Sequence, residues 1–243
     1  MARLAGVTVP GILLRKTSLV DYPGTLASVI FFSGCNLRCP WCHNRELVLG
    51  GPSPDYITPE EALAHLEKRR KVLGGAVLSG GEPTLFPELG TFIGRIKSLG
   101  LRVKLDTNGT LPAVLRELFA SEETRPDYVA LDLKTAPDRY RDLLPGAAGP
   151  QSGEFLNNEP RGEHSPADSG EDPGEALKES AALLRASGIP HEFRSLLLPP
   201  PWFGGEARAA LAPLAGESPW RIRPFVPGNC LDPAWNALTG TGK

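Results

Sequence analysis

The chain has 243 residues, a length that fits one sizeable domain or one domain with an appendage. Apolar residues make up 41% and charged residues 22%, which is typical of a folded globular protein, and the net charge of −2 argues against a general binder of nucleic acid or of anionic membranes. No apolar run approaches the length of a membrane span. The first 14 residues lack the pattern of a signal peptide, so we expect a cytoplasmic protein.

Strand and helix patterns alternate along the chain. The expected strands are 27–33, 76–79, 101–106, 127–133, 189–198 and 220–226. The expected helices begin at Thr58, cover 87–99, 111–119 and 138–144, begin again at Asp172, and cover 206–214. Six strands that alternate with helices predict a parallel sheet, either a partial barrel or an open doubly wound sheet.

The composition changes over residues 145–173, which are rich in Gly, Pro, Ser, Asn, Glu and Asp and almost free of large apolar residues. Such a segment cannot bury enough surface to offset its ordering entropy, so we expect a mobile polar insertion there. Residues 1–24 are expected to form an N-terminal extension. The whole chain, 1–243, is otherwise interpreted as a single domain.

Polar motifs follow the first four expected strands. Cys35 follows the first strand, and Gly80-Gly81-Glu82 follows the second. Asp106 and Asn108 lie at the end of the third strand, and Asp132 and Lys134 at the end of the fourth. Because the carboxyl ends of parallel strands meet at one edge, these motifs predict a single active site.

Three of the four cysteines lie within eight residues, with the spacing Cys35-x3-Cys39-x2-Cys42. Three thiolates on one loop can bind an iron–sulfur cluster and leave one iron without a protein ligand. The alternative is a structural zinc site completed by Cys230 or His43. Cys230 is isolated in the sequence and is expected to be structural.

The segment CNLRCPWC, with Trp41 before its last cysteine, resembles the signature of the radical S-adenosylmethionine (radical SAM) superfamily. This resemblance implies an α/β fold of the partial (β/α)6 TIM-like barrel type. It implies a 4Fe-4S cluster on Cys35, Cys39 and Cys42, whose open iron is chelated by S-adenosylmethionine. Reductive cleavage of that cofactor then gives methionine and a 5′-deoxyadenosyl radical. The segment 79–84 resembles the superfamily's GGEP element, which contacts the methionine amino group.

Longer segments resemble a narrower group, the activating enzymes of glycyl radical enzymes, and within it the anaerobic ribonucleoside-triphosphate reductase activating proteins. The segments are 16–24, 106–109, 131–134, 193–199 and 223–233, and only 145–173 cannot be matched. This resemblance implies an oxidoreductase that works anaerobically and abstracts a hydrogen from the Cα of a glycine in a partner enzyme. It also implies a flavodoxin or ferredoxin as electron donor.

The same resemblance assigns roles to individual residues. Lys134 is expected to pair with the cofactor's carboxylate and Asp132 with its ammonium group. Arg194 lies in a strand that runs toward the site, and its guanidinium could hold a carboxylate. No side chain is expected to be catalytic beyond the cluster and the cofactor. The expected cofactor-binding residues are Trp41, His43, Asn44, Gly80, Gly81, Glu82, Asp106, Asn108, Asp132, Lys134 and Arg194.

Some of these residues could instead have purely structural roles. Lys134 could be a surface lysine, Asn108 part of an Asn-Gly turn, and Arg194 a member of a structural ion pair. Two other functions also remain open. The chain could be a radical SAM enzyme that acts on a small molecule or another peptide, or a non-catalytic zinc-binding protein.

Overall fold

A computed structural model describes residues 11–49, 53–147 and 172–238. One sheet contains seven strands in sequence order. They are β1 (Ile12–Ser18), β2 (Ala27–Phe32), β3 (Gly75–Gly80), β4 (Arg102–Thr107), β5 (Tyr128–Asp132), β6 (His191–Leu197) and β7 (Trp220–Pro224). The strands from β2 to β7 are parallel neighbours, and β1 pairs antiparallel with β2. The sheet is therefore a six-stranded parallel core with one antiparallel edge strand.

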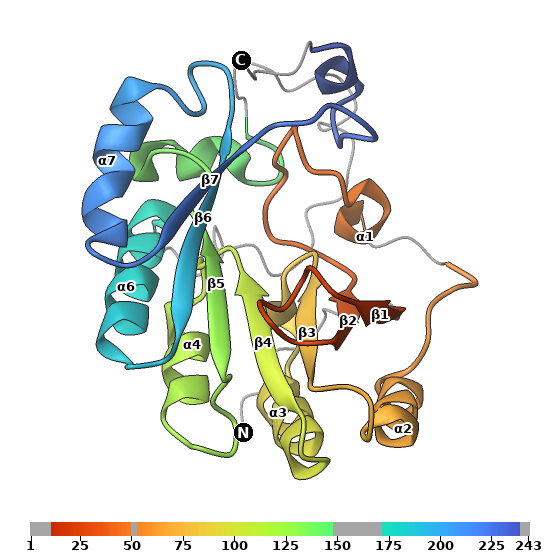
Figure 1. Ribbon diagram of the computed structural model, residues 1–243. Coiled ribbons are helices and arrows are strands. Elements are labelled where there is room, and N and C mark those ends of the chain that lie inside the picture. Colours follow the sequence, from red (N-terminus) through yellow and green to blue (C-terminus); the bar gives the residue numbers. More distant parts are fainter. Residues whose placement is uncertain (1–10, 50–52, 148–171, 239–243) are drawn as a thin grey trace.

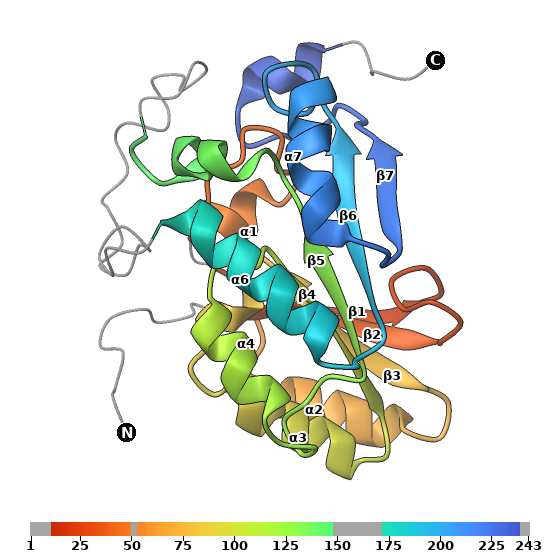
Figure 2. The same cartoon turned by 90° about the vertical axis from the view of Figure 1, so that its left-hand side faces the viewer.

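The helices connect the parallel strands. The α-helices are α1 (Arg45–Leu49), α2 (Pro59–Arg69), α3 (Leu89–Ser98), α4 (Pro112–Phe119), α6 (Pro173–Ala186) and α7 (Gly205–Ala215). The described part of the chain also contains the short 3-10 helices η1 (Pro83–Leu85), η2 (Pro137–Leu143) and η4 (Pro233–Ala237). Figure 1 shows α7, α6 and α4 along one side and α3 and α2 below, and Figure 2 shows α7, α6 and α4 in front of the strands. Among the described residues, no helix is long and apolar enough to cross a membrane.

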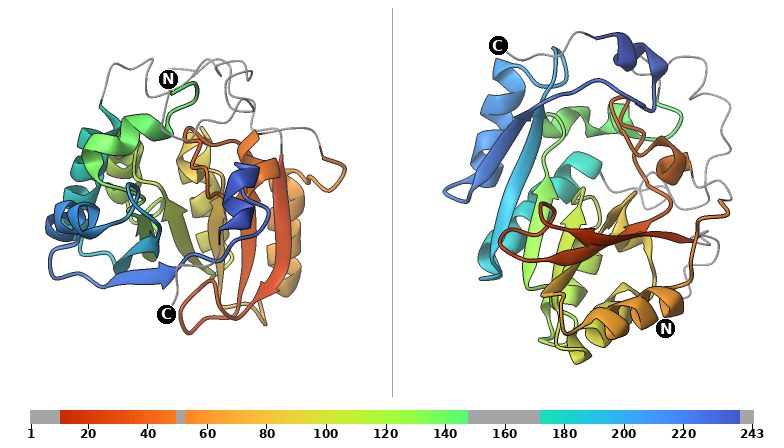
Figure 3. Two further views of the ribbon diagram at one scale, coloured as in Figure 1. Left: turned by 90° about the horizontal axis from the view of Figure 1, so that it is seen from above. Right: turned by 45° about the vertical axis from the view of Figure 1, so that its right-hand side comes forward.

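The sheet curves without closing. Figure 3 (left) shows it from above, with the helices on the outside of the curve. The first and last strands, β1 and β7, each have one neighbour in the sheet, so the barrel stays open between them. The expected α/β fold, a partial TIM-like barrel, is confirmed.

The two faces of each central strand have different surroundings. In β4, Val103 and Leu105 are fully buried in the main apolar core, whereas Lys104 and Asp106 lie on the concave face. The strand β2 is apolar on both faces, because Ile30 belongs to the main core and Val29 to a smaller cluster with Tyr22 and Val77. Burial on both faces explains why β2 is a continuous apolar run.

The local signals in the sequence are well reproduced. Thr58 accepts from the backbone N–H of Glu61, and the Glu61 carboxylate accepts from the backbone N–H of Thr58, so the expected capping box begins α2. Asp172 caps α6 by accepting from Gly174 and Glu175. The helix expected at 138–144 forms as the 3-10 helix η2.

Two features differ from the sequence interpretation or lie outside the structure. Strand β1 was not expected, since residues 1–24 were interpreted only as an extension; it forms because its backbone pairs with β2, a long-range contact that local patterns do not reveal. Most of the expected insertion at 145–173 lies outside the described residues.

Candidate active site

The three cysteines lie on the loop that leaves the carboxyl end of β2. The loop is tied at several points: Gly34 N donates to Leu47 O at 2.7 Å, and Arg38 N donates to Leu143 O at 2.6 Å. The Arg38 guanidinium also donates to the carbonyl of Cys35 at 2.7 Å. At the other end of the loop, Leu231 N donates to Cys42 O at 2.8 Å. The loop is thus held in place by elements from both halves of the chain.

All three cysteines are free thiols, and Cys39 is 6% exposed. Burial raises the pKa of Cys35 to about 12, and burial also raises the pKa values of Cys39 and Cys42. Ligand thiols must be deprotonated, so cluster binding here would release protons. Among residues 11–49, 53–147 and 172–238, no three Cys, His, Asp or Glu side chains are placed to hold a single metal ion.

The donor set fits an iron–sulfur cluster. Soft thiolates are the usual ligands of such clusters. All three thiols line one open-sided cavity of about 490 Å³. Further donors approach one sulfur, because Leu37 N lies 3.4 Å and Asn108 Nδ2 4.0 Å from Cys35 Sγ. Donors of this kind tune the reduction potential of a cluster.

The glycine pair after β3 packs tightly against the beginning of the cysteine loop. A Cβ on Gly81 would lie 1.9 Å from the carbonyl oxygen of Gly34, and a Cβ on Gly80 would lie 2.5 Å from the backbone of Phe32. Gly80 also has a φ of +116°, a conformation that favours glycine. In addition, Glu82 N donates to Gly34 O at 2.9 Å. The two predicted motifs therefore form one backbone unit.

Glu82 is 1% exposed, and its carboxylate accepts four hydrogen bonds. Its Oε1 accepts from Thr84 N at 3.1 Å, Thr84 Oγ1 at 2.6 Å and Thr107 Oγ1 at 2.8 Å, and its Oε2 accepts from Asn108 N at 2.7 Å. These bonds join the ends of β3 and β4. They use most of the acceptor sites of the carboxylate, with one bond on Oε2 and three on Oε1.

The amide of Asn108 continues this network to the cysteine loop. Its Nδ2 donates to Asn36 Oδ1 at 2.8 Å, and its Oδ1 accepts from the hydroxyl of Thr110 at 2.7 Å. Asn36 Nδ2 in turn donates to Thr110 Oγ1 at 2.8 Å. All three side chains are buried, so this end of β4 braces the residue that follows Cys35.

Charged side chains of β4, β5 and β6 meet at the same rim. Arg194 Nε donates to Asp132 Oδ1 at 2.8 Å, and Arg194 Nη1 lies 3.4 Å from Asp106 Oδ1. Lys134 Nζ lies 3.3 Å from Asp132 Oδ2. Burial would raise the pKa of Asp132, but Arg194 and Lys134 outweigh burial and hold that pKa below its usual value. Asp132 is therefore ionised at neutral pH.

Aromatic and amide groups complete the cysteine side of the site. The Trp41 ring is 4% exposed and packs between Trp202 and Trp235, with ring centroids 5.0 and 5.3 Å away. Asn44 Nδ2 donates to Gly80 O at 3.0 Å and so ties the loop to the glycine segment. His43 is exposed and lies 5.8 Å from the ring of Phe225.

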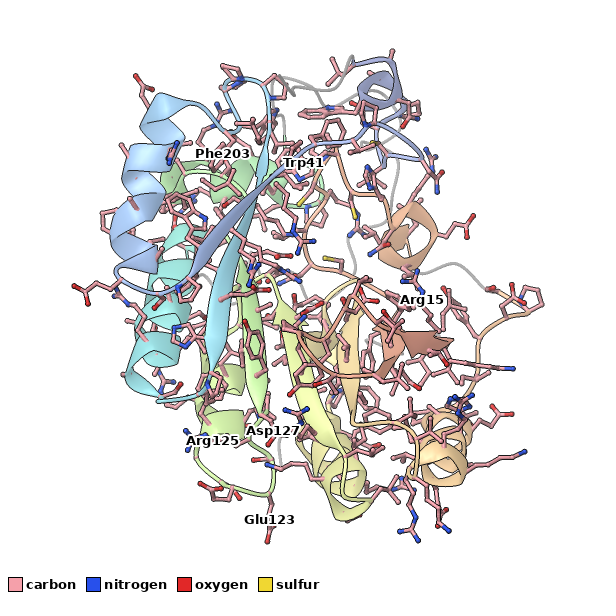
Figure 4. All side chains as sticks on the ribbon, viewed as in Figure 1. Arg15, Trp41, Glu123, Arg125, Asp127 and Phe203 are labelled. Carbon is pink, nitrogen blue, oxygen red and sulfur yellow. The ribbon has the colours of Figure 1, made fainter. Side chains whose placement is uncertain are left out.

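One cavity brings together the three cysteines and all eleven residues expected to bind the cofactor. Sequence reasoning missed several other residues that line it: Asp21, Leu37, Val48, Ser79, Thr107, Leu196 and Arg223. Strand alternation was the available signal for Leu196 and Arg223, since they share a face with Arg194 and Arg221. Figure 4 places Trp41 at the upper end of the molecule, far from Glu123, Arg125 and Asp127, which precede β5 at the other end. The cavity thus lies at the carboxyl ends of the strands.

Comparison with curated proteins gives relatives of two kinds. The protein of Methanocaldococcus jannaschii named "Putative glycyl-radical enzyme activating enzyme MJ1227" is 39% identical over 128 residues, which is 52% of this chain and 51% of the relative. The pyruvate formate-lyase-activating enzyme of Clostridium pasteurianum is 34% identical over 150 residues, 59% of this chain and 60% of the relative. The 7-carboxy-7-deazaguanine synthase of Hyperthermus butylicus is 35% identical over 130 residues, 52% of this chain and 49% of the relative. The chain spans about half the length of the curated relatives it matches.

Solved structures share the fold. A radical SAM methyltransferase from Sphaerobacter thermophilus superposes with a TM-score of 0.54 at 18% identity, over 85% of this chain and 58% of that one. The family model described as "Radical SAM superfamily" matches residues 29–200, more than half of the chain. Members of this superfamily use a 4Fe-4S cluster and S-adenosylmethionine, which agrees with the free thiols and the cavity described above. The chain belongs to the radical SAM superfamily.

Proposed function

We propose that this protein is an activating enzyme that abstracts a hydrogen from a glycine Cα of a glycyl radical enzyme, with anaerobic ribonucleoside-triphosphate reductase as the partner. The observation that carries the proposal is that one cavity, at the carboxyl ends of the strands, gathers the three cysteines and all eleven residues expected to bind the cofactor. Two of the relatives above carry activating-enzyme names. We assign the cluster to Cys35, Cys39 and Cys42.

In this proposal the side chains and backbone of the protein bind and orient S-adenosylmethionine. When bound, the reduced cluster supplies the electron that cleaves S-adenosylmethionine and so gives a radical able to take a hydrogen atom. Lys134 and Arg194 present positive charge to the cofactor's carboxylate, and the backbone of Gly80 and Gly81 allows its amino group to approach closely. Trp41 and Leu37 supply apolar walls that limit water in the cavity.

The surroundings of the cavity favour a protein as the substrate. Asp21 lines the cavity, and its neighbours Leu19 and Val20 are 78% and 81% exposed. Beyond the opposite edge strand, Val226 is 67% exposed. Large apolar side chains exposed beside a site are typical of protein interaction surfaces. Glycine suits the reaction because its Cα radical is flanked by two peptide groups and carries no side chain.

A second candidate is a radical SAM enzyme that acts on a small molecule. The similarity to a 7-carboxy-7-deazaguanine synthase favours it, since that relative matches about as much of the chain as the activases do. A non-catalytic zinc protein is the third reading, and the assays below exclude it if the loaded protein contains iron and cleaves S-adenosylmethionine.

The decisive experiment combines the loaded protein with candidate partners. The protein is reconstituted anaerobically with iron and sulfide, reduced, and mixed with S-adenosylmethionine and the ribonucleotide reductase of the same organism. We expect methionine, 5′-deoxyadenosine and the electron-spin doublet of a glycyl radical. The Gly→Ala variant of the partner at its radical position is the matched control. A doublet only with a different glycyl radical enzyme would reassign the partner, and cleavage without a doublet on any of them would favour the small-molecule enzyme.

We also propose a cytoplasmic protein that takes its electron from a flavodoxin or ferredoxin. All four cysteines are free in the structure, as expected in a reducing compartment. Cleavage of S-adenosylmethionine with reduced flavodoxin or ferredoxin in place of a chemical reductant tests the donor directly.

A further inference from the structure

A lysine that the sequence did not single out lies behind the charged rim of the cavity. Lys104 is on the concave face of β4, two residues before Asp106, and its side chain is 2% exposed. Its ammonium group forms an ion pair with Asp106 Oδ1. Within the described part of the chain, Lys104 forms this one ion pair.

Lys104 is the end of an alternating row of charges. The row begins with Lys104 and Asp106 of β4, passes through Arg194 of β6, and ends at Asp132 of β5 and the nearby Lys134. Each side chain forms an ion pair with the next one. Three cations and two carboxylates leave one net positive charge. The other oxygen of Asp106 accepts from the hydroxyl of Ser79 at 3.0 Å, so Lys104 and Arg194 provide the charges that neutralise this carboxylate.

Stability alone does not explain a buried lysine at this position. Replacing a buried ion pair by apolar residues of similar volume is often neutral or stabilising. A charge that is retained against its desolvation cost, next to a site, points to a role in that site.

The ion pairs of Arg194 indicate how the charge of Lys104 acts on the cavity. Arg194 is shared between two carboxylates, with Nε on Asp132 and Nη1 at 3.4 Å from Asp106. This leaves its remaining guanidinium N–H groups for the cavity that it lines. Without Lys104, Asp106 would depend on Arg194 for its positive charge, and the row would have no net charge.

We propose that Lys104 is a positioning residue: it neutralises Asp106, keeps Arg194 shared between Asp106 and Asp132, and preserves the net positive charge that receives the carboxylate of S-adenosylmethionine. The proposal rests on the proposed function, because it takes S-adenosylmethionine as the ligand. Lys104 acts through Asp106 and Arg194 and does not itself line the cavity.

The test measures binding, without turnover. The anaerobically reconstituted full chain is titrated with S-adenosylhomocysteine, which keeps the amino and carboxylate groups and lacks the sulfonium that the cluster cleaves. We expect Lys104→Met to weaken binding about tenfold or more, because one net charge is lost near a carboxylate. Lys104→Arg keeps the charge and should bind within about threefold of the unchanged protein. Lys97→Met, at a half-buried lysine outside the cavity, is the matched control.

A ligand without the carboxylate separates charge from packing. 5′-Methylthioadenosine keeps the adenosine and the sulfur but has neither the amino nor the carboxylate group, so Lys104→Met should bind it within about threefold of the unchanged protein. Lys104→Gln removes the same charge, and it takes the place of Lys104→Met in both titrations if that variant does not fold. S-adenosylhomocysteine binding by the neutral variant equal to that of the unchanged protein, or an equal loss of affinity for both ligands, would overturn the role of Lys104.

The failure of the proposed function gives a different result. An unchanged, iron-loaded protein that neither binds S-adenosylhomocysteine nor cleaves S-adenosylmethionine would overturn both proposals. Normal binding and cleavage by the unchanged protein, together with normal binding by Lys104→Met, would overturn only the positioning role.

Discussion

The two faces of the sheet differ although the same strands form them. On the convex face, Leu105 of β4 and Leu131 of β5 are fully buried against the helices. On the concave face of the same strands lie Asp106 and Asp132, which line the cavity. Burial of apolar area on the convex face stabilises the fold, while the concave face holds charges whose net contribution to stability is small. The comparison implies that changes on the two faces should have separable effects on folding and on cofactor binding.

The largest expected effect is on function alone. Cys39→Ala should abolish cluster binding, because two thiolates cannot hold the cluster on this loop, whereas the melting temperature of the apo protein should change little. Iron and sulfide analysis after anaerobic reconstitution measures the first, and thermal unfolding the second. Cys230→Ala, at a buried cysteine outside the cavity, is the matched control and should retain the cluster. Loss of the cluster in both variants would show that the ligands are misassigned.

A substitution on the convex face should lower stability and leave ligand binding unchanged. Leu105→Ala should lower the free energy of unfolding by about 2–5 kcal/mol, since Leu105 is fully buried and its removal leaves a cavity. The affinity of the folded protein for S-adenosylhomocysteine should stay the same. Leu19→Ala, at a leucine that is 78% exposed, should not change the stability. A strong loss of affinity in Leu105→Ala would mean that the two faces are coupled.

Glu82 lies just after the carboxyl end of β3, and its carboxylate is bonded to the end of β4. Glu82→Gln should lower the free energy of unfolding by about 1–3 kcal/mol, because the amide nitrogen of glutamine faces N–H and O–H donors in place of a carboxylate oxygen. Denaturant unfolding measures this loss, with the exposed Glu88→Gln as control. A large loss of S-adenosylhomocysteine affinity at unchanged stability would instead show that the carboxylate contacts the cofactor.

The smallest effect concerns the helical layer. Asp172→Ala should lower the free energy of unfolding by about 1 kcal/mol at pH 7, because the side chain caps α6. A hydrogen bond from the Arg141 side chain lowers the pKa of Asp172. The contribution of a carboxylate with a lowered pKa is present above its unfolded pKa of about 3.9 and is lost as the pH falls through the folded value. The difference between the two proteins should therefore shrink below about pH 4.

Urea unfolding at pH 7 and at acidic pH measures that difference. Asp138→Ala is the control, because Asp138 lies in the first turn of η2 without making a capping bond. A difference that grows as the pH falls would contradict the assignment of the cap.

The features that could be predicted from the sequence are those that depend on short segments of the chain. The capping box of Thr58 and Glu61, the cysteine loop and the parallel pairing of the strands depend on neighbouring residues or on simple alternation. Strand β1 was missed because Arg15 and Lys16 interrupt its apolar pattern and its pairing with β2 is antiparallel. Lys104 was missed because a lysine in a strand is normally solvated, and only the curvature of the whole sheet buries it.

The contact between the cysteine loop and residues 230–235 joins segments that are synthesised at different times. Arg45 donates to Leu231 O across 186 residues of sequence, and Leu231 N donates to Cys42 O. At ribosomal rates of about 5–20 residues per second, this separation corresponds to roughly 10–40 s of synthesis. During that interval the three thiols have emerged without the segment that fixes their loop. A cluster that needs the fixed loop is therefore expected to be inserted only after the segment around Leu231 has been synthesised.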